Sequence, residues 1–177
     1  MRSGPHALIV YASTSGSTVE VVRLICRAIP AMEITHFDLG TEGPVTPAWT
    51  SSRFDLVLAG TPTYGKGDWH SAWERRQNDV LPALRTADSV MLFALGDSRS
   101  HRATFAGGLG TLARFSRAAG ARIIGSTIPT DEAAAACPAV EAGRLPGLAI
   151  QYRRQRNGVA AQIQNWLSDL PKEWREA

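Results

Sequence analysis

The strongest constraint on the fold is an alternation of short apolar runs with segments of helical periodicity. The predicted strands 7–12, 54–61 and 89–97 contain continuous apolar runs at 7–12, 56–60 and 90–96, whereas 32–39 alternates between apolar and polar residues. A strand that is apolar at every position is buried on both faces, and strands separated by helices pair in parallel. The expected elements are strands at 7–12, 32–39, 54–61, 89–97, 121–126 and 147–151, and helices at 17–29, 68–84, 102–120 and 159–170. The sequence therefore predicts a parallel sheet with helices on both faces and with 32–39 nearer an edge.

The composition is that of one globular domain spanning residues 1–177. Hydrophobic residues make up 44% of the chain and charged residues 20%, which suits a folded core rather than a disordered chain. No apolar run approaches the length of a membrane span, and the apolar part of the N-terminal segment is too short for a secretory signal. Cys26 and Cys137 are far apart in sequence, which argues against a disulfide scaffold. We therefore expect a cytoplasmic protein without membrane contact, and the net charge of +3 is too small to indicate nucleic-acid binding.

The loop after the first predicted strand is rich in hydroxyl side chains. Ligands of open parallel sheets bind beyond the carboxyl ends of the strands, which selects the loops 12–18, 61–70 and 95–105. The first loop reads "ASTSGST" and precedes a helix, whose free N–H groups favour an anion such as a phosphate monoester. The dinucleotide and nucleoside-triphosphate glycine motifs are absent. A loop that merely caps the helix explains the same residues, so this pattern alone leaves both interpretations open.

The second and third loops carry rings beside glycines. The second loop, "GTPTYGKGDW", places Tyr64 next to Gly65, an arrangement that can form a slot for a flat ligand. Trp73 lies four residues after Trp69, and we expect Trp73 to be a core residue of a helix. In the third loop, His101 lies where a second ring could close the slot.

Together the three loops resemble the flavodoxin family, in a long-chain and unusually basic form. Residues 13–18 match the family motif Thr/Ser-x-Thr/Ser-Gly-x-Thr, and residues 60–64 match Gly-x-Pro-Thr-aromatic. Residues 96–105 match the third motif, Gly-Asp-Gln-x-x-Tyr-x-x-x-Phe, in part: Ser98 replaces the glutamine and His101 replaces the tyrosine.

This resemblance implies a flavodoxin-like three-layer α/β/α sandwich around a five-stranded parallel sheet of order 2-1-3-4-5. The segment 127–146 resembles the insertion that splits the fifth strand. The resemblance also implies noncovalent FMN, with its phosphate on residues 13–18, its ring edge on the backbone of 61–66 and 95–97, and Tyr64 and His101 on its two ring faces. The implied FMN contacts are Ser13, Thr14, Ser15, Gly16, Ser17, Thr18, Thr61, Pro62, Thr63, Tyr64, Gly65, Lys66, Leu95, Gly96, Asp97, His101 and Phe105.

The function implied by the resemblance is that of a monomeric one-electron carrier between a reductase and a redox acceptor, without a substrate of its own. The sequence agrees in lacking an acid, base and nucleophile at triad spacing; His70, Ser71 and Glu74 do not provide one. The family is usually acidic, so the positive charge predicts a less reducing flavin and favours acidic redox partners. A charge that lies far from the flavin would not affect the choice of partner, and both interpretations of the charge stay open. Two alternatives stay open: an FMN-dependent quinone or azo reductase, and an interaction domain that has lost FMN.

Overall fold

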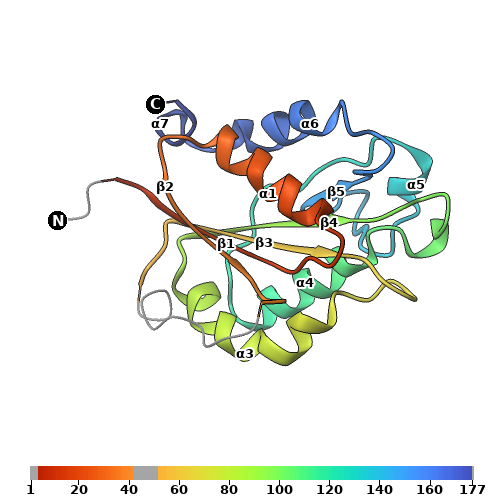
Figure 1. Ribbon diagram of the computed structural model, residues 1–177, viewed down its shortest axis with the longest axis horizontal. Coiled ribbons are helices and arrows are strands. Elements are labelled where there is room, and N and C mark those ends of the chain that lie inside the picture. Colours follow the sequence, from red (N-terminus) through yellow and green to blue (C-terminus); the bar gives the residue numbers. More distant parts are fainter. Residues whose placement is uncertain (1–3, 42–51, 177) are drawn as a thin grey trace.

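The central feature of the fold is a five-stranded parallel sheet. The computed structural model describes residues 4–41 and 52–176 (Figure 1). The single domain was predicted to span 1–177, so its parts at 1–3, 42–51 and 177 lie outside the described residues. The strands are β1 (His6–Tyr11), β2 (Glu33–Asp38), β3 (Leu56–Pro62), β4 (Ser89–Leu95) and β5 (Leu148–Ile150). Their order is β2-β1-β3-β4-β5, and every neighbouring pair is parallel, as predicted.

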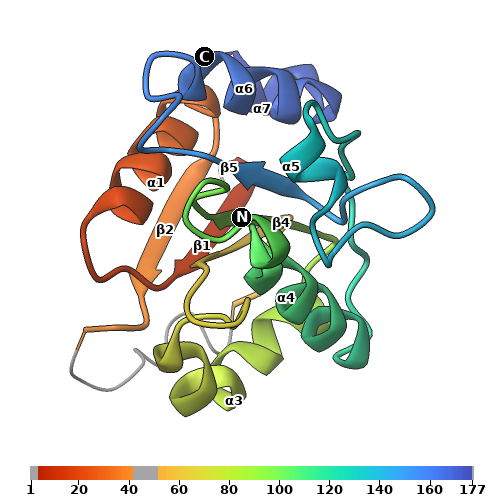
Figure 2. The same ribbon diagram turned by 90° about the vertical axis from the view of Figure 1, so that its right-hand side faces the viewer.

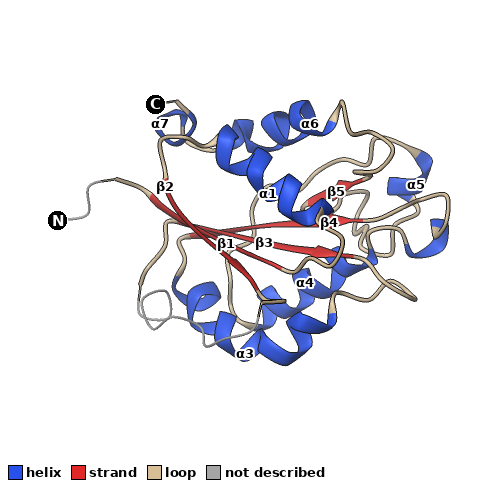
Figure 3. Ribbon diagram, in the orientation of Figure 1, coloured by secondary structure: helices blue, strands red, loops and turns tan. Residues whose placement is uncertain are grey.

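Helices cover both faces of the sheet and complete three layers. In Figure 3 the helices α1 and α6 lie above the strands, and α3 and α4 lie below them. The helical segments are α1 (Ser17–Ala28), α3 (Ser71–Thr86), η1 (Arg102–Thr104), α4 (Gly107–Ala118), α5 (Glu132–Ala135), α6 (Val159–Trp166), η2 (Leu167–Asp169) and α7 (Lys172–Arg175). None of these helices is long and apolar enough to cross a bilayer.

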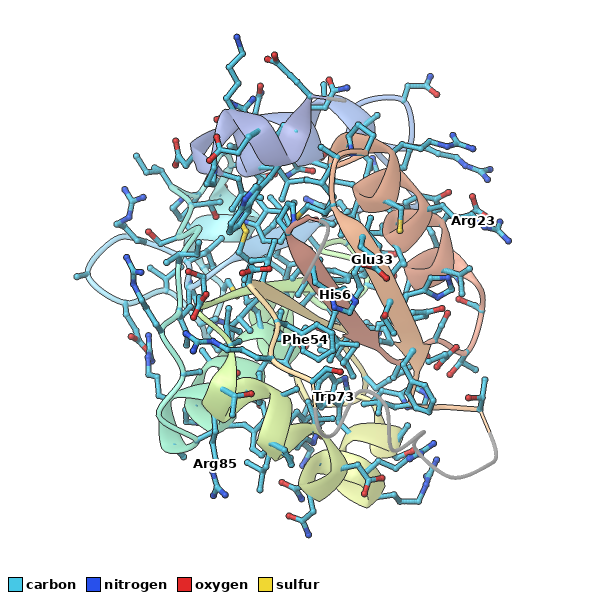
Figure 4. The ribbon with its side chains drawn as sticks, turned by 90° about the vertical axis from the view of Figure 1, so that its left-hand side faces the viewer. His6, Arg23, Glu33, Phe54, Trp73 and Arg85 are labelled. Carbon is cyan, nitrogen blue, oxygen red and sulfur yellow. The ribbon has the colours of Figure 1, made fainter. Side chains whose placement is uncertain are left out.

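The core is divided in two by the sheet because successive side chains of a strand point to opposite faces. In β1, Leu8 and Val10 join the cluster under α3 and α4, whereas Ile9 joins the cluster under α1 and α6. Trp73 is fully buried in the α3 layer, as predicted, and its Nε1 donates to the carbonyl of Gly60 over 3.0 Å. Figure 4 views the end of the sheet opposite the carboxyl ends of the strands, where His6 lies beside Phe54.

The fifth strand is split, and its first part is shorter than predicted. In the expected strand 121–126, pairing is limited to one parallel bridge between Ile123 and Val90. Gly125 follows with a φ of 75°, which is outside the range of a strand and ends the pairing. The chain returns to β4 only at β5, after the insertion 127–146.

The outer side of β5 is closed by side-chain hydrogen bonds. The hydroxyl of Thr127 donates to the carbonyl of Gly147 over 2.6 Å, and Nε2 of Gln162 donates to the carbonyl of Ala149 over 3.3 Å. The insertion and α6 thus satisfy two carbonyls that β4 does not reach.

Two predicted helices begin later than expected. The helix predicted from residue 68 begins at Ser71, because Asp68 bonds back to Tyr64 in a turn and His70 caps the helix. The segment predicted as one helix from residue 102 is the single turn η1 followed by α4, and Ala106 between them has a left-handed φ of 51°. Both changes leave irregular backbone at the carboxyl ends of the strands.

Candidate functional site

A cleft of about 280 Å³ lies where the carboxyl ends of the strands meet the loops that follow them. The end of the sheet that bears these loops faces the viewer in Figure 2. The cleft is lined by Thr14, Ser15, Ser17, Thr18, Pro62, Thr63, Tyr64, Leu95, Gly96, Asp97, Ser100, His101, Tyr152 and Arg153. Four loops therefore build the cleft: the three that the sequence analysis selected and the one after β5.

The hydroxyl loop 13–18 forms one end of the cleft. Gly16 has a φ of 83°, which glycine adopts without strain, and its carbonyl accepts from the amide of Glu20 as the first bond of α1. The amides before Glu20 precede that bond and belong to the unpaired first turn of the helix. The hydroxyl of Ser13 is buried and has no hydrogen-bond partner among the described residues. This end of the cleft thus combines unpaired neutral donors with the positive end of a helix dipole.

The loop 61–70 forms a tight turn that presents Tyr64. The amide and carbonyl of Tyr64 bond to Asp68 at 2.9 Å in both directions, and the turn uses positive φ angles at Gly65 (51°) and Gly67 (100°). Beneath the turn, a Cβ at Gly107 would lie 2.6 Å from the Gly67 carbonyl, so α4 approaches the loop as closely as glycine permits. Tyr64 is 43% exposed and is one of the two exposed large hydrophobic residues in the described part of the chain, so part of its surface is open to a ligand.

His70 connects the hydroxyl loop to the aromatic loop. Its Nδ1 accepts from the amide of Ala72 over 3.0 Å, so the ring proton lies on Nε2, which donates to the Thr14 hydroxyl over 2.8 Å. The Tyr64 ring meets the imidazole edge-on with 5.5 Å between ring centroids. Burial, assisted by the nearby Arg75, lowers the pKa of His70 and keeps the imidazole neutral.

The loop after β4 carries a paired carboxylate. Asp97 accepts from the amide of Arg99, from the hydroxyl of Ser100 and from Nε of Arg154, at 3.0, 3.1 and 3.0 Å. These donors, the Arg99 amide first, lower the pKa of Asp97 to about 2. His101 is exposed and lines the cleft beyond this carboxylate.

The structure brings most of the predicted FMN contacts to this cleft, but not all of them. The predicted contacts that do not line it are Ser13, Gly16, Thr61, Gly65, Lys66 and Phe105. Thr61 is fully buried and accepts from the amide of His70 over 2.9 Å. Phe105 is a core residue, and a Cβ at Gly96 would lie 2.8 Å from its ring. Gly65 and Lys66 occupy the exposed tip of the turn.

Three lining residues were missed as site residues. Ser100, Tyr152 and Arg153 border the cleft, and the last two follow β5. The position of β5 beside β4 was predicted, so its following loop could have been included by the same rule that selected the other three. His70 was also missed, because its role depends on a contact with a residue far away in sequence.

The sheet order and the cleft at its carboxyl edge define a flavodoxin-like α/β protein. The chain belongs to the flavodoxin family: the family model described as Flavodoxin matches residues 9–166. This chain is 27% identical over 167 residues to the flavodoxin of Helicobacter pylori, and the match covers 92% of this chain and 94% of that flavodoxin. Flavodoxin 1 of Azotobacter vinelandii is 26% identical over 176 residues, covering 96% and 97%. A mutant flavodoxin of Fusobacterium nucleatum, solved bound to flavin mononucleotide, superimposes with a TM-score of 0.81 at 25% identity, covering 96% of each chain.

Proposed function

We propose that the protein is an electron carrier that holds FMN noncovalently in the cleft and has no substrate of its own. The observation that carries the proposal is that a hydroxyl-rich helix start and an exposed aromatic ring line one cleft. When bound, FMN supplies reversible one-electron chemistry. The residues of this chain position it, exclude water from one ring face and tune its charge.

The hydroxyl loop fits the phosphate of FMN. A phosphate has acceptor oxygens, and the loop offers hydroxyl donors and the unpaired amides at the start of α1. The hydroxyls of Thr14, Ser15, Ser17 and Thr18 belong to residues that line the cleft, so they can donate to an acceptor placed in it. Because Thr14 accepts its bond from His70, its own hydroxyl proton remains available to donate to the phosphate.

The opposite end of the cleft fits the flavin ring. Tyr64 is exposed and offers its ring for stacking, and His101 lines the same cleft. We assign the hydrogen bonds to the ring edge to the backbone of residues 61–66 and 95–97. In this assignment Phe105 acts only from beneath, by supporting Gly96.

The charge at the mouth of the cleft suits an acidic redox partner. Lys66 and Arg99 are exposed, and neither side chain has an ion-pair partner among the described residues. Asp97 forms an ion pair with Arg154. In the loops 61–70 and 95–105, Asp68 is the carboxylate that has no ion-pair partner among the described residues. Positive potential beside the flavin favours acidic donors and acceptors by steering their approach. We propose that an acidic reductase and an acidic acceptor dock in turn at the mouth of the cleft. We also propose that the protein acts as a monomer in the cytoplasm.

Reconstitution with FMN tests this function. Added FMN should lose its fluorescence and give a yellow 1:1 complex, which after photoreduction should pass electrons to ferricyanide, an anionic acceptor. NADH or NADPH alone should not reduce the complex. Direct oxidation of either nucleotide, with turnover of a quinone or azo dye, would instead identify a reductase. A folded protein that does not take up FMN would identify an interaction domain.

A further inference from the structure

The loop after β5 places an arginine at the hydroxyl end of the cleft. Arg153 lines the cleft together with Ser15 and Ser17. It also lines an adjoining groove with Ser15, Gly16 and Ser17. Arg153 thus lies beside the hydroxyl loop in both the cleft and the adjoining groove, although most of the sequence separates it from that loop.

The guanidinium of Arg153 has no hydrogen-bond or ion-pair partner among the described residues. Its neighbours are engaged: Arg154 pairs with Asp97, and Nε of Arg156 donates to the hydroxyl of Tyr152 over 3.3 Å. Glu20, the carboxylate that borders the adjoining groove, pairs with Arg23. Arg156 also borders the adjoining groove, but among the described residues Arg153 is the arginine that lines the cleft itself, and its guanidinium has no partner there.

The backbone beneath Arg153 is fixed from two sides. Gln151 is buried, and its side-chain oxygen accepts from the hydroxyl of Ser98 over 2.6 Å. The carbonyl of Gln151 accepts from the amides of Arg154 and Gln155 at 3.1 and 3.0 Å, which closes a turn around residues 152 and 153. The Arg156 guanidinium lies over the Tyr152 ring at 5.5 Å. The turn thus holds the Arg153 backbone in place, while its side chain is exposed.

We propose that Arg153 binds the phosphate of the FMN, an inference that rests on the proposed function. The hydroxyl loop supplies neutral donors only, so a phosphate dianion held by it alone keeps its full charge. A guanidinium can pair with two phosphate oxygens at once and neutralise part of that charge. The site then distinguishes FMN from riboflavin by charge as well as by hydrogen bonds, and it favours the dianionic phosphate.

Paired affinities for FMN and riboflavin test this assignment. Quenching of flavin fluorescence gives both dissociation constants, for the wild type and for Arg153→Gln. Arg153→Gln should weaken FMN binding roughly tenfold, in line with the loss of a charge-assisted hydrogen bond, and should leave riboflavin binding unchanged. High salt should weaken FMN binding to the wild type more than to this variant. Arg153→Lys keeps the charge without the planar fork and should recover part of the loss.

The control and a second readout separate a phosphate contact from a general effect of charge or folding. Arg85→Gln removes an exposed cation that does not line the cleft, and it should leave the ratio of the two affinities unchanged. In ³¹P NMR titrations, the phosphate of bound FMN should have a higher pKa in Arg153→Gln than in the wild type. If Arg153→Gln changed neither the affinity ratio nor the phosphate pKa, the assignment of Arg153 to the phosphate would be overturned, and the proposed function would stand. Failure of the wild type to bind FMN would overturn the proposed function as well.

Discussion

The Nε2 of His70 lies 2.8 Å from the hydroxyl oxygen of Thr14 and joins the start of α3 to the hydroxyl loop before α1. The same imidazole caps α3 through Nδ1, so both of its nitrogens are in use. The proton on Nε2 is required for the first contact, and the lone pair on Nδ1 is required for the second. Only the neutral ring satisfies both.

The first prediction follows from this neutral ring. The pKa of His70 is below its ordinary value of 6.5, so near and below that pH the unfolded chain binds a proton more readily than the folded one. The free energy of unfolding should therefore fall as the pH drops through about 6.5. In His70→Asn, which retains a good helix cap but does not titrate, this fall should be smaller. Urea unfolding above and below that pH compares the two, and equal falls would contradict the prediction.

A second prediction concerns the exposed ring of Tyr64. Replacing it with leucine should weaken FMN binding about fivefold, because stacking between aromatic rings contributes roughly 1 kcal/mol beyond the area buried. Stability should hardly change, since the ring is 43% exposed. Fluorescence quenching measures the affinity. Ile128→Ala serves as the control, because Ile128 is another exposed large apolar residue (67%) and does not line the cleft.

A third prediction separates backbone strain from redox function. Gly65→Ala and Gly143→Ala both place a side chain at positive φ (51° and 75°), with space for the Cβ in each case. Both should lose roughly 1 kcal/mol of stability. Only Gly65 lies in the turn at the cleft, so only Gly65→Ala should shift the potential of the first reduction step. Spectroelectrochemistry of the FMN complexes would refute this if the two variants gave the same potential.

A fourth prediction tests the core beneath the cleft. A Cβ at Gly60 would overlap the ring of Phe93 on the neighbouring strand, so Gly60→Ala should lose about 1–3 kcal/mol of stability by overpacking. The second substitution Phe93→Leu should recover part of that loss in the double mutant. Additive losses in urea unfolding would argue against overpacking as the cause.

A fifth prediction concerns the charge at the mouth of the cleft. Oxidation of the photoreduced complex by anionic ferricyanide should slow severalfold in the double variant Lys66→Glu, Arg99→Glu at low salt. Oxidation by a cationic cobalt(III) hexaammine should accelerate, and added salt should reduce both effects. Arg85→Glu is the control for each of the two single variants, Lys66→Glu and Arg99→Glu, because it changes the net charge by the same amount and Figure 4 places Arg85 on α3 in the view of the opposite end of the sheet. Equal effects from Arg85→Glu would show that only net charge matters.

The sequence predicted the sheet well because the strands β1, β3 and β4 are apolar on both faces and β2 alternates as an edge strand does. That pattern specifies burial, and alternation with helices specifies parallel pairing, so the strand order followed once the family resemblance was recognised. The strand at 121–126 was predicted too long because Ile123 and Ile124 have high β propensity, whereas Gly125 at positive φ ends the pairing. Local propensity does not reveal that tertiary limit.

The candidate site was predicted less completely because several of its contacts join distant segments. Tyr64 and the hydroxyl loop belong to local motifs, and both line the cleft. Phe105 belongs to a motif as well, but its burial under Gly96 depends on packing that the motif does not encode. His70 and Arg153 reach the hydroxyl loop only through the fold.

The side chains that close the outer side of β5 affect how molecules of this protein meet each other in solution. An uncovered edge strand is a template on which another chain can add a strand, the first step of many aggregates. Thr127 and Gln162 already occupy the carbonyls of Gly147 and Ala149. A second molecule would have to displace both before it could extend the sheet, so this border resists growth into fibres.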